Sequence, residues 1–156
     1  MKFYPTFLTL HIVFAGVWII FFAVDIVLKS KINDSNEKNM KYKLMELYLH
    51  LTNLFGIVGF VGIALTGIAL VSLNPGYGYF DMSHAHWLAT KQIIFIIILV
   101  NTFFRIIPAA KKLRNYIKNE EDKVDAQFNS VTRINLLINI LVIINFIFAI
   151  THRFLG

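Results

Sequence analysis

Four long apolar runs limit what this chain can fold into. They cover residues 5–24, 47–73, 92–104 and 134–152, and the third extends towards the N-terminus through Lys91 to about Trp87. The first, second and fourth runs contain no Asp, Glu, Lys or Arg over about 19 residues or more, which is the length of helix that crosses the hydrocarbon core of a membrane. The sequence therefore predicts an all-α integral membrane protein.

The chain, residues 1–156, has room for one small domain of four transmembrane helices, at about 4–28, 44–73, 84–107 and 131–153. A hydrophobic fraction of 57% and a mean hydropathy of +0.65 argue against a soluble enzyme. The connections are short, which favours an up-down-up-down bundle.

Turn-forming and polar residues predict where the helices end. We expect residues 30–43 to form a polar linker and Asn74-Pro75-Gly76 to stop the second helix. Asp81 or Ser83 is expected to cap the third helix, which should end before Pro108. Charged residues alternate with apolar ones over 109–129, which predicts helical extensions beyond the membrane.

The distribution of positive charge along the chain indicates a membrane topology. Lys and Arg gather in residues 29–43 and 105–133, whereas residues 74–86 contain neither. The positive-inside rule places the two basic segments in the cytoplasm and both termini outside. The net charge of +6 therefore does not indicate nucleic-acid binding, and we expect a multi-pass protein of the bacterial inner membrane. The first apolar run lacks a basic leader and a cleavage site, so we interpret it as a retained helix.

Polar residues form a stripe on each predicted helix. The helical repeat aligns His11, Trp18 and Asp25 in the first helix, and a seven-residue spacing relates His84, Lys91 and Arg105 in the third. The other two stripes are Glu46, His50 and Asn53, and Asn135, Asn139, Asn145 and His152. Because polar side chains avoid lipid, we expect the four stripes to face one another.

Depth along the helices divides these residues into two clusters. The outer cluster is expected to contain His11, His84, His86, Lys91 and His152, and the inner one Asp25, Glu46, His50, Asn53 and Arg105. The residues of the inner cluster could also have a purely structural role, with Asp25 paired with Arg105 and Glu46 paired with His50. The asparagines of the fourth helix are expected to hydrogen-bond between helices.

The absence of cysteine (Cys 0) excludes disulfides, iron–sulfur clusters, thiolate haem ligation and c-type haem attachment. Imidazole is a good axial ligand for haem iron, and helical bundles hold haem between facing helices. Lys91 could then meet a propionate, and Trp18 could pack on the ring. A copper or zinc site built from His11, His84, His86 and His152 remains open.

Small residues recur along the second helix, at Gly56, Gly59, Gly62 and Gly67, near Thr52 and Thr66. Such residues allow two helices to approach closely in lipid. They would also let a flat macrocycle lie against the backbone. We favour helix packing.

Two short motifs are similar to those of known families. In the first predicted helix, Leu10-His11 is followed by Trp18, and the third helix contains Trp87-Leu88-Ala89-Thr90-Lys91. Both motifs resemble HemJ-type protoporphyrinogen oxidases, and the first also resembles the wider set of small CopD-like membrane proteins. The resemblance spans roughly residues 7–114. The Pro-Arg and Tyr-His that end HemJ-type first helices are replaced here by residues 24–29.

The resemblance implies that His11 is a haem b ligand, that Lys91 is essential, and that protoporphyrinogen IX is oxidised with electrons passing towards the respiratory chain. The additional histidines favour bis-histidine ligation, with His84 and then His86 or His152 as the second ligand. His50 would ligate a second haem if one is present.

We therefore expect a haem b-binding redox protein of the inner membrane. It would transfer electrons or act as an oxidase, with a porphyrinogen or quinone as substrate and Lys91 holding a propionate or gating a proton. Two alternatives stay open, a copper-binding or copper-transporting CopD-like protein and a non-catalytic accessory subunit. The expected partners are the lipid bilayer, a respiratory-chain protein or a second copy of the chain.

Overall fold

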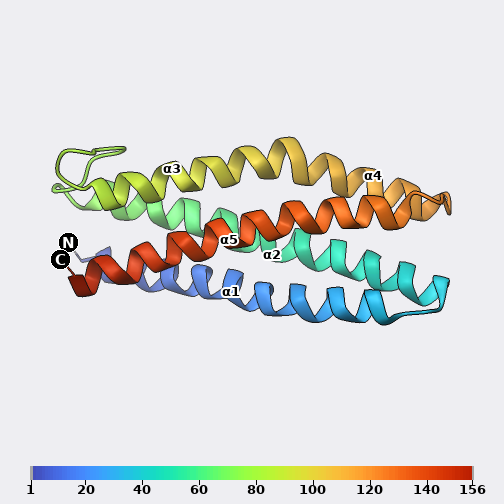
Figure 1. Cartoon of the computed structure of the whole chain (residues 1–156). Helices are drawn as coiled ribbons and strands as arrows, with labels where there is room; N and C mark the ends of the chain where they lie inside the picture. The colour runs from blue at the N-terminus through green and yellow to red at the C-terminus, as the bar shows by residue number, and fades with distance from the viewer. Residues whose placement is uncertain (1, 156) are drawn as a thin grey trace. The chain divides into compact units, whose positions relative to one another are not determined.

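The computed structural model describes the backbone of residues 2–155 and the side chains of residues 2–151. Every regular element in this part of the chain is a helix, as predicted. Figure 1 shows the elements in order: α1 (Tyr4–Asp34), α2 (Lys38–Leu73), α3 (His86–Asn101), the π-helical segment η1 (Thr102–Ile106), α4 (Ile107–Lys118) and α5 (Val124–Leu155).

Four helical stretches are long and apolar enough to cross a membrane, namely Tyr4–Asp34, Lys38–Leu73, His86–Lys118 and Val124–Thr151. Within their most apolar windows only 11% to 22% of the residues are buried. Large apolar side chains such as Ile20, Leu65 and Phe104 are exposed instead. A water-soluble protein rarely exposes so much apolar surface, so lipid covers these faces. The protein is a multi-pass membrane protein.

The chain divides into two compact units, Met1–Tyr79 and Phe80–Gly156. The first is a hairpin in which α1 packs against α2. In the second, the continuous rod formed by α3, η1 and α4 packs against α5. Each hairpin therefore supplies its own interhelical contacts, and each is described by itself below.

The first hairpin is longer than predicted. α1 runs to Asp34 and α2 begins at Lys38, so the linker expected over residues 30–43 is reduced to residues 35–37. Ile32 and Met45 are fully buried, which shows that the two helices stay packed beyond their apolar runs. Local polarity gave the wrong boundary because one buried apolar residue per turn is enough to keep two polar helix ends together.

α2 ends at Leu73, which confirms the stop predicted from Asn74-Pro75-Gly76. The side chain of Asn74 closes the turn, because its Oδ1 accepts a hydrogen bond from the Gly76 backbone N–H at 3.0 Å. Tyr79 then folds back along the helix, and its hydroxyl donates to the Ile68 carbonyl oxygen at 3.1 Å. The end of α2 is thus covered by its own connection.

α3 begins at His86, later than predicted, and its N-cap residue Ala85 provides no side-chain cap. The expectation that Asp81 or Ser83 caps this helix is wrong. The carboxylate of Asp81 accepts hydrogen bonds from Ser83 and His84 instead, so it stabilises a separate turn before the helix. His84 belongs to that turn and is not part of the helical stripe.

The third transmembrane helix does not end before Pro108. It continues through η1 into α4, and Pro108 occupies the first turn of α4, where a missing N–H is tolerated. The Ile107 N–H donates to the Thr102 carbonyl five residues earlier. The extra residue of this wide turn breaks the predicted seven-residue alignment, since Ile98 is buried while Arg105 is exposed.

The predicted helical extension over residues 109–129 is confirmed by α4 and the first turns of α5. The apolar residues of this region are buried, namely Leu113, Ile117, Val124 and Phe128. Gln127 also donates from Nε2 to the Ala109 carbonyl oxygen at 3.0 Å. The polar ends of the second hairpin are therefore held by apolar packing and by a side-chain bond to the backbone.

Candidate functional site

His11 of α1 is hydrogen-bonded to Thr66 of α2. Its Nδ1 lies 2.8 Å from Thr66 Oγ1, and that hydroxyl donates its single proton to the Gly62 carbonyl oxygen at 2.6 Å. The hydroxyl therefore acts as an acceptor towards His11, which places the ring proton on Nδ1 and the lone pair on Nε2. A neutral imidazole in this tautomer is the form that ligates metals through Nε2.

The ring of His11 is half-buried and packs on the backbone of α2. A Cβ atom built on Gly67 would lie 3.5 Å from His11 Cε1, in ordinary van der Waals contact, so the His11 ring lies against α2 at Gly67. The sequence indicated Thr66 and Gly67 only as small residues that favour helix packing. The register of the hairpin places Thr66 as the hydrogen-bond acceptor of His11 and Gly67 in contact with its ring.

Trp18 is buried on α1, two helical turns after His11 and on the same face. A Cβ atom built on Gly59 would lie 3.5 Å from the indole ring, and Phe60 meets the indole edge-on with ring centroids 6.3 Å apart. Phe14 fills the space above Gly62 so closely that a Cβ there would overlap its ring. The overlap at Gly62 supports helix packing as the role of that glycine, whereas Gly59 has room for a Cβ in ordinary contact with the indole.

A buried polar cluster lies towards the linker end of the same hairpin. Asp25 is only 1% exposed, and its Oδ2 pairs with Lys29 Nζ at 2.6 Å. Its Oδ1 accepts a hydrogen bond from the buried Tyr48 hydroxyl of α2 at 2.7 Å. Lys29 and Tyr48 are thus the partners found for Asp25, while Arg105 donates to Asn101 Oδ1 at 3.3 Å. Sequence reasoning missed Tyr48, although a tyrosine in an apolar helix signals a buried partner for its hydroxyl.

The polar stripe of α2 turns away from α1. Glu46, His50 and Asn53 are exposed, whereas Tyr48 and Leu49 between them are buried. His50 is therefore not part of the polar cluster around Asp25 in the first hairpin.

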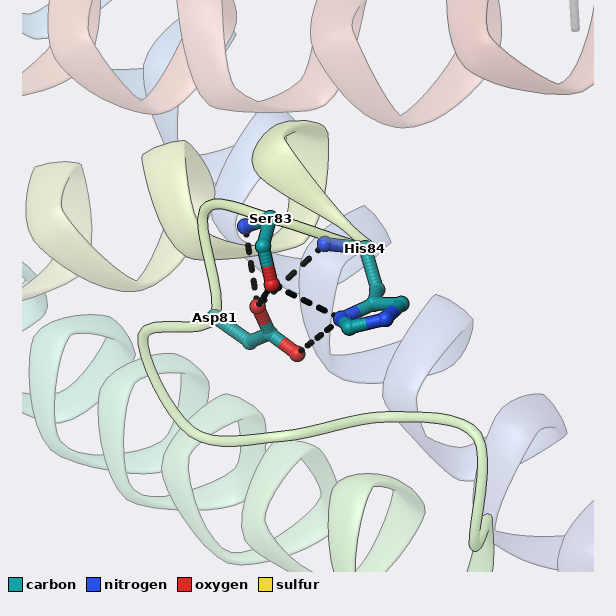
Figure 2. A network of polar contacts seen from close by, with 3 residues as sticks. All are labelled: Asp81, Ser83 and His84. Carbon is teal, nitrogen blue, oxygen red and sulfur yellow. Dashed lines mark hydrogen bonds and ion pairs between the residues drawn. The ribbon is translucent and has the colours of Figure 1, made fainter.

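In the second hairpin, the connection before α3 contains a hydrogen-bonded turn over residues 81–84, here called the Asp81 turn (Figure 2). Asp81 Oδ1 accepts from the Ser83 N–H at 2.9 Å, the Ser83 hydroxyl at 2.6 Å and the His84 N–H at 3.2 Å. The Ser83 hydroxyl bond, followed by the two backbone bonds, lowers the pKa of Asp81 from 3.8 to about 2.

The imidazole of His84 is oriented by the same turn. Its Nδ1 lies 2.7 Å from Ser83 Oγ and 3.2 Å from Asp81 Oδ2, and dashed lines mark both contacts in Figure 2. Since the Ser83 proton is donated to Asp81, both neighbours of Nδ1 act as acceptors. His84 therefore carries its proton on Nδ1, with its side chain 80% exposed.

Lys91 is half-buried on α3. Its ammonium lies 5.6 Å from the centroid of the Trp87 ring, a distance typical of a cation–π contact. Asn145 of α5 donates from Nδ2 to the Lys91 carbonyl oxygen at 3.5 Å, which supports the predicted role of these asparagines between helices. Asn139 is 4% exposed, and its Nδ2 has no hydrogen-bond partner among the described residues, nor does Asn145 Oδ1.

The predicted outer cluster is distributed over both units. His11 lies in the first, His84, His86 and Lys91 lie in the second, and the side chain of His152 lies outside the described residues. His86 is exposed at the first position of α3. No group of three or more His, Asp or Glu side chains suited to a metal occurs in the part of the chain that the structure describes. Comparisons with protein-family models, curated proteins and solved structures found no match.

Proposed function

We propose that this protein binds haem b through His11 and serves as a redox protein of the bacterial inner membrane. The observation that carries the proposal is the hydrogen bond from His11 Nδ1 to Thr66, whose own proton is donated to Gly62. This arrangement leaves the lone pair on Nε2, the nitrogen through which His11 would bind iron, and orients the ring. An outer hydrogen bond of this kind accompanies most metal-bound histidines.

The remaining donor chemistry agrees with haem b. The chain has no cysteine, so imidazole is the strongest axial ligand that it offers. Bound haem b would supply a one-electron couple between ferric and ferrous iron. His11 would orient the group, and Lys91, which is half-buried on α3, would pass a proton to or from the substrate.

Electron transfer or oxidase activity with a porphyrinogen or a quinone is the function that we infer. The motifs around His11 and Trp87-Leu88-Ala89-Thr90-Lys91 support this class, because they resemble those of HemJ-type oxidases. The basic residues of the α1–α2 linker region and of α4 support an orientation with both termini outside the cytoplasm.

An absorption spectrum of the detergent-purified protein tests haem binding directly. We expect a Soret band that shifts on reduction, and a pyridine haemochromogen of the b type. His11→Ala should lose the pigment, and the matched control His50→Ala, which changes an exposed histidine of α2, should keep it. Lys91→Met should retain haem but lower the rate of porphyrinogen oxidation or quinone reduction.

Two results would contradict the proposal. One is a colourless protein from cells supplied with haem precursor, and the other is an unchanged spectrum in His11→Ala. A colourless protein that carries stoichiometric copper, lost in His11→Ala, would favour the copper alternative. Co-purification with other subunits and no cofactor would favour an accessory role.

The absence of cysteine also makes the topology easy to test. Asn36→Cys places a thiol in the linker between α1 and α2, and Met82→Cys places one before α3, at positions that are both exposed. A membrane-impermeant maleimide added to intact spheroplasts should label Met82→Cys and leave Asn36→Cys unlabelled. The opposite pattern would invert the proposed orientation.

A further inference from the structure

We infer that the connection before α3 binds a divalent transition-metal ion through the imidazoles of His84 and His86. The inference rests on a different part of the chain and a different set of hydrogen bonds from the His11 proposal. Its starting point is that a solvent-exposed imidazole is held in one orientation by a serine and a carboxylate.

The Asp81 turn prepares His84 as a ligand. Nδ1 donates towards Ser83 Oγ and Asp81 Oδ2, as Figure 2 shows, so a metal bound at Nε2 would leave both contacts intact. A histidine that binds metal through one nitrogen and donates to a carboxylate through the other is a recurrent arrangement in metal sites. Such a bond fixes the tautomer and makes the ligating nitrogen more basic.

The turn itself is well defined. Asp81 Oδ1 accepts three hydrogen bonds, two from backbone N–H groups and one from the Ser83 hydroxyl. The backbone that carries His84 is therefore fixed to the same carboxylate that orients the ring. Little conformational freedom is left for the ligand to lose when a metal binds.

His86 supplies the second nitrogen. It follows His84 by two residues and is exposed at the first position of α3, while Ala85 between them is buried. The buried residue anchors the short segment, and both histidines remain accessible to an ion from solution.

The charge around this segment favours a cation. Residues 74–86 contain Asp81 and no Lys or Arg, so no positive side chain of this segment opposes a bound cation. Imidazole pairs suit Cu²⁺, Ni²⁺ and Zn²⁺, with Cu²⁺ bound most tightly for a given donor set. The class of ligand is therefore a borderline transition metal, with water completing the coordination.

Titration of the full-length, metal-stripped protein tests the site. The protein should carry an affinity tag without histidine and be titrated with Cu²⁺ and Zn²⁺ by calorimetry in detergent. We expect one equivalent of either ion to bind, and the Cu²⁺ complex to show superhyperfine coupling to two nitrogens in its EPR spectrum. His84→Ala and His86→Ala should each weaken binding at least about tenfold, and Asp81→Asn about 10- to 100-fold.

Control variants distinguish this site from the one proposed around His11. His11→Ala and His50→Ala should bind Cu²⁺ as the unmodified protein does, and the double variant His84→Ala/His86→Ala should lose Cu²⁺ binding. Binding that survives in the double variant, or that disappears in His11→Ala, would overturn the inference. Circular dichroism of each variant checks that the helices are intact.

Discussion

Gly62 of α2 faces Phe14 of α1 so closely that a methyl group at position 62 would overlap the phenyl ring. Gly56 lies on the same helix, and a Cβ there would meet nothing within 4 Å. Replacing each glycine by alanine therefore makes the same chemical change with and without an opposing side chain. We expect Gly62→Ala to weaken the α1–α2 hairpin and Gly56→Ala to leave it intact or strengthen it.

The size of the effect follows from two opposing contributions. Alanine favours a helix over glycine by up to about 1 kcal/mol, and this gain is common to both variants. Overfilling a packed contact destabilises by about 1–3 kcal/mol, and only Gly62→Ala incurs it. The free energy of unfolding of Gly62→Ala should thus be about 1–3 kcal/mol below that of Gly56→Ala. In a Phe14→Ala background the difference should fall close to zero.

Trp18 provides the reporter, because its indole packs on Gly59 and Phe60 of α2. With Trp87 replaced by phenylalanine, Trp18 is the single tryptophan, and its emission reports separation of the hairpin during SDS titration of mixed micelles. Equal stability of Gly62→Ala and Gly56→Ala would refute the reasoning. So would a stability difference that persists when Phe14 is alanine.

Three further outcomes are expected. Tyr48→Phe removes the hydroxyl that donates to the buried Asp25 carboxylate and should lower the free energy of unfolding by about 1.5–3 kcal/mol. The control Tyr42→Phe should change the free energy of unfolding by less than about 0.5 kcal/mol. Equal effects of the two variants would exclude a special role for Tyr48. Thr66→Val removes the hydroxyl that accepts from His11 Nδ1 and should weaken haem binding about 10- to 100-fold. Thr66→Ser keeps a hydroxyl and should retain the haem affinity. Full haem affinity in Thr66→Val would count against His11 as the ligand. Because the pKa of Asp81 is lowered in the fold, its contribution to the turn is fully present above pH 3.8 and is lost as the pH falls through about 2. The ¹³C shift of the Asp81 carboxyl should therefore titrate near pH 2, and nearer 3.8 in Ser83→Ala; an unchanged midpoint in that variant would contradict the assigned cause.

The number of transmembrane helices could be predicted from the sequence because each apolar run carries its own signal. The end of α2 could be predicted for the same reason, since Asn74-Pro75-Gly76 acts locally. The inner ends of α1 and α2 could not. They depend on burial of Ile32 and Met45, a tertiary effect that residue polarity does not reveal.

The candidate site shows the same division between local and tertiary information. His11 was recognised from an ionisable side chain inside an apolar run, but Thr66, its hydrogen-bond acceptor, lies 55 residues away in the sequence. The start of α3 was placed too early because Asp81 has the residue type of a helix cap. In the fold its acceptor capacity is used by the turn before the helix, which no pattern of residue types distinguishes from capping.

The π-helical segment η1 sets the rotational phase between the two ends of a long rod. Each residue of an α-helix advances the chain by about 100°, so Ile106, eight residues after Ile98, would lie about 80° off the buried face of a regular helix, and the wide turn of η1 brings it back onto that face. Leu113 and Ile117 are buried with Ile106, so the second half of the rod keeps one face towards α5, against which α4 packs. The wide turn therefore absorbs one extra residue without turning the second half of the rod away from its neighbour, and removal of one residue from Thr102–Ile106 should leave α4 packed on α5.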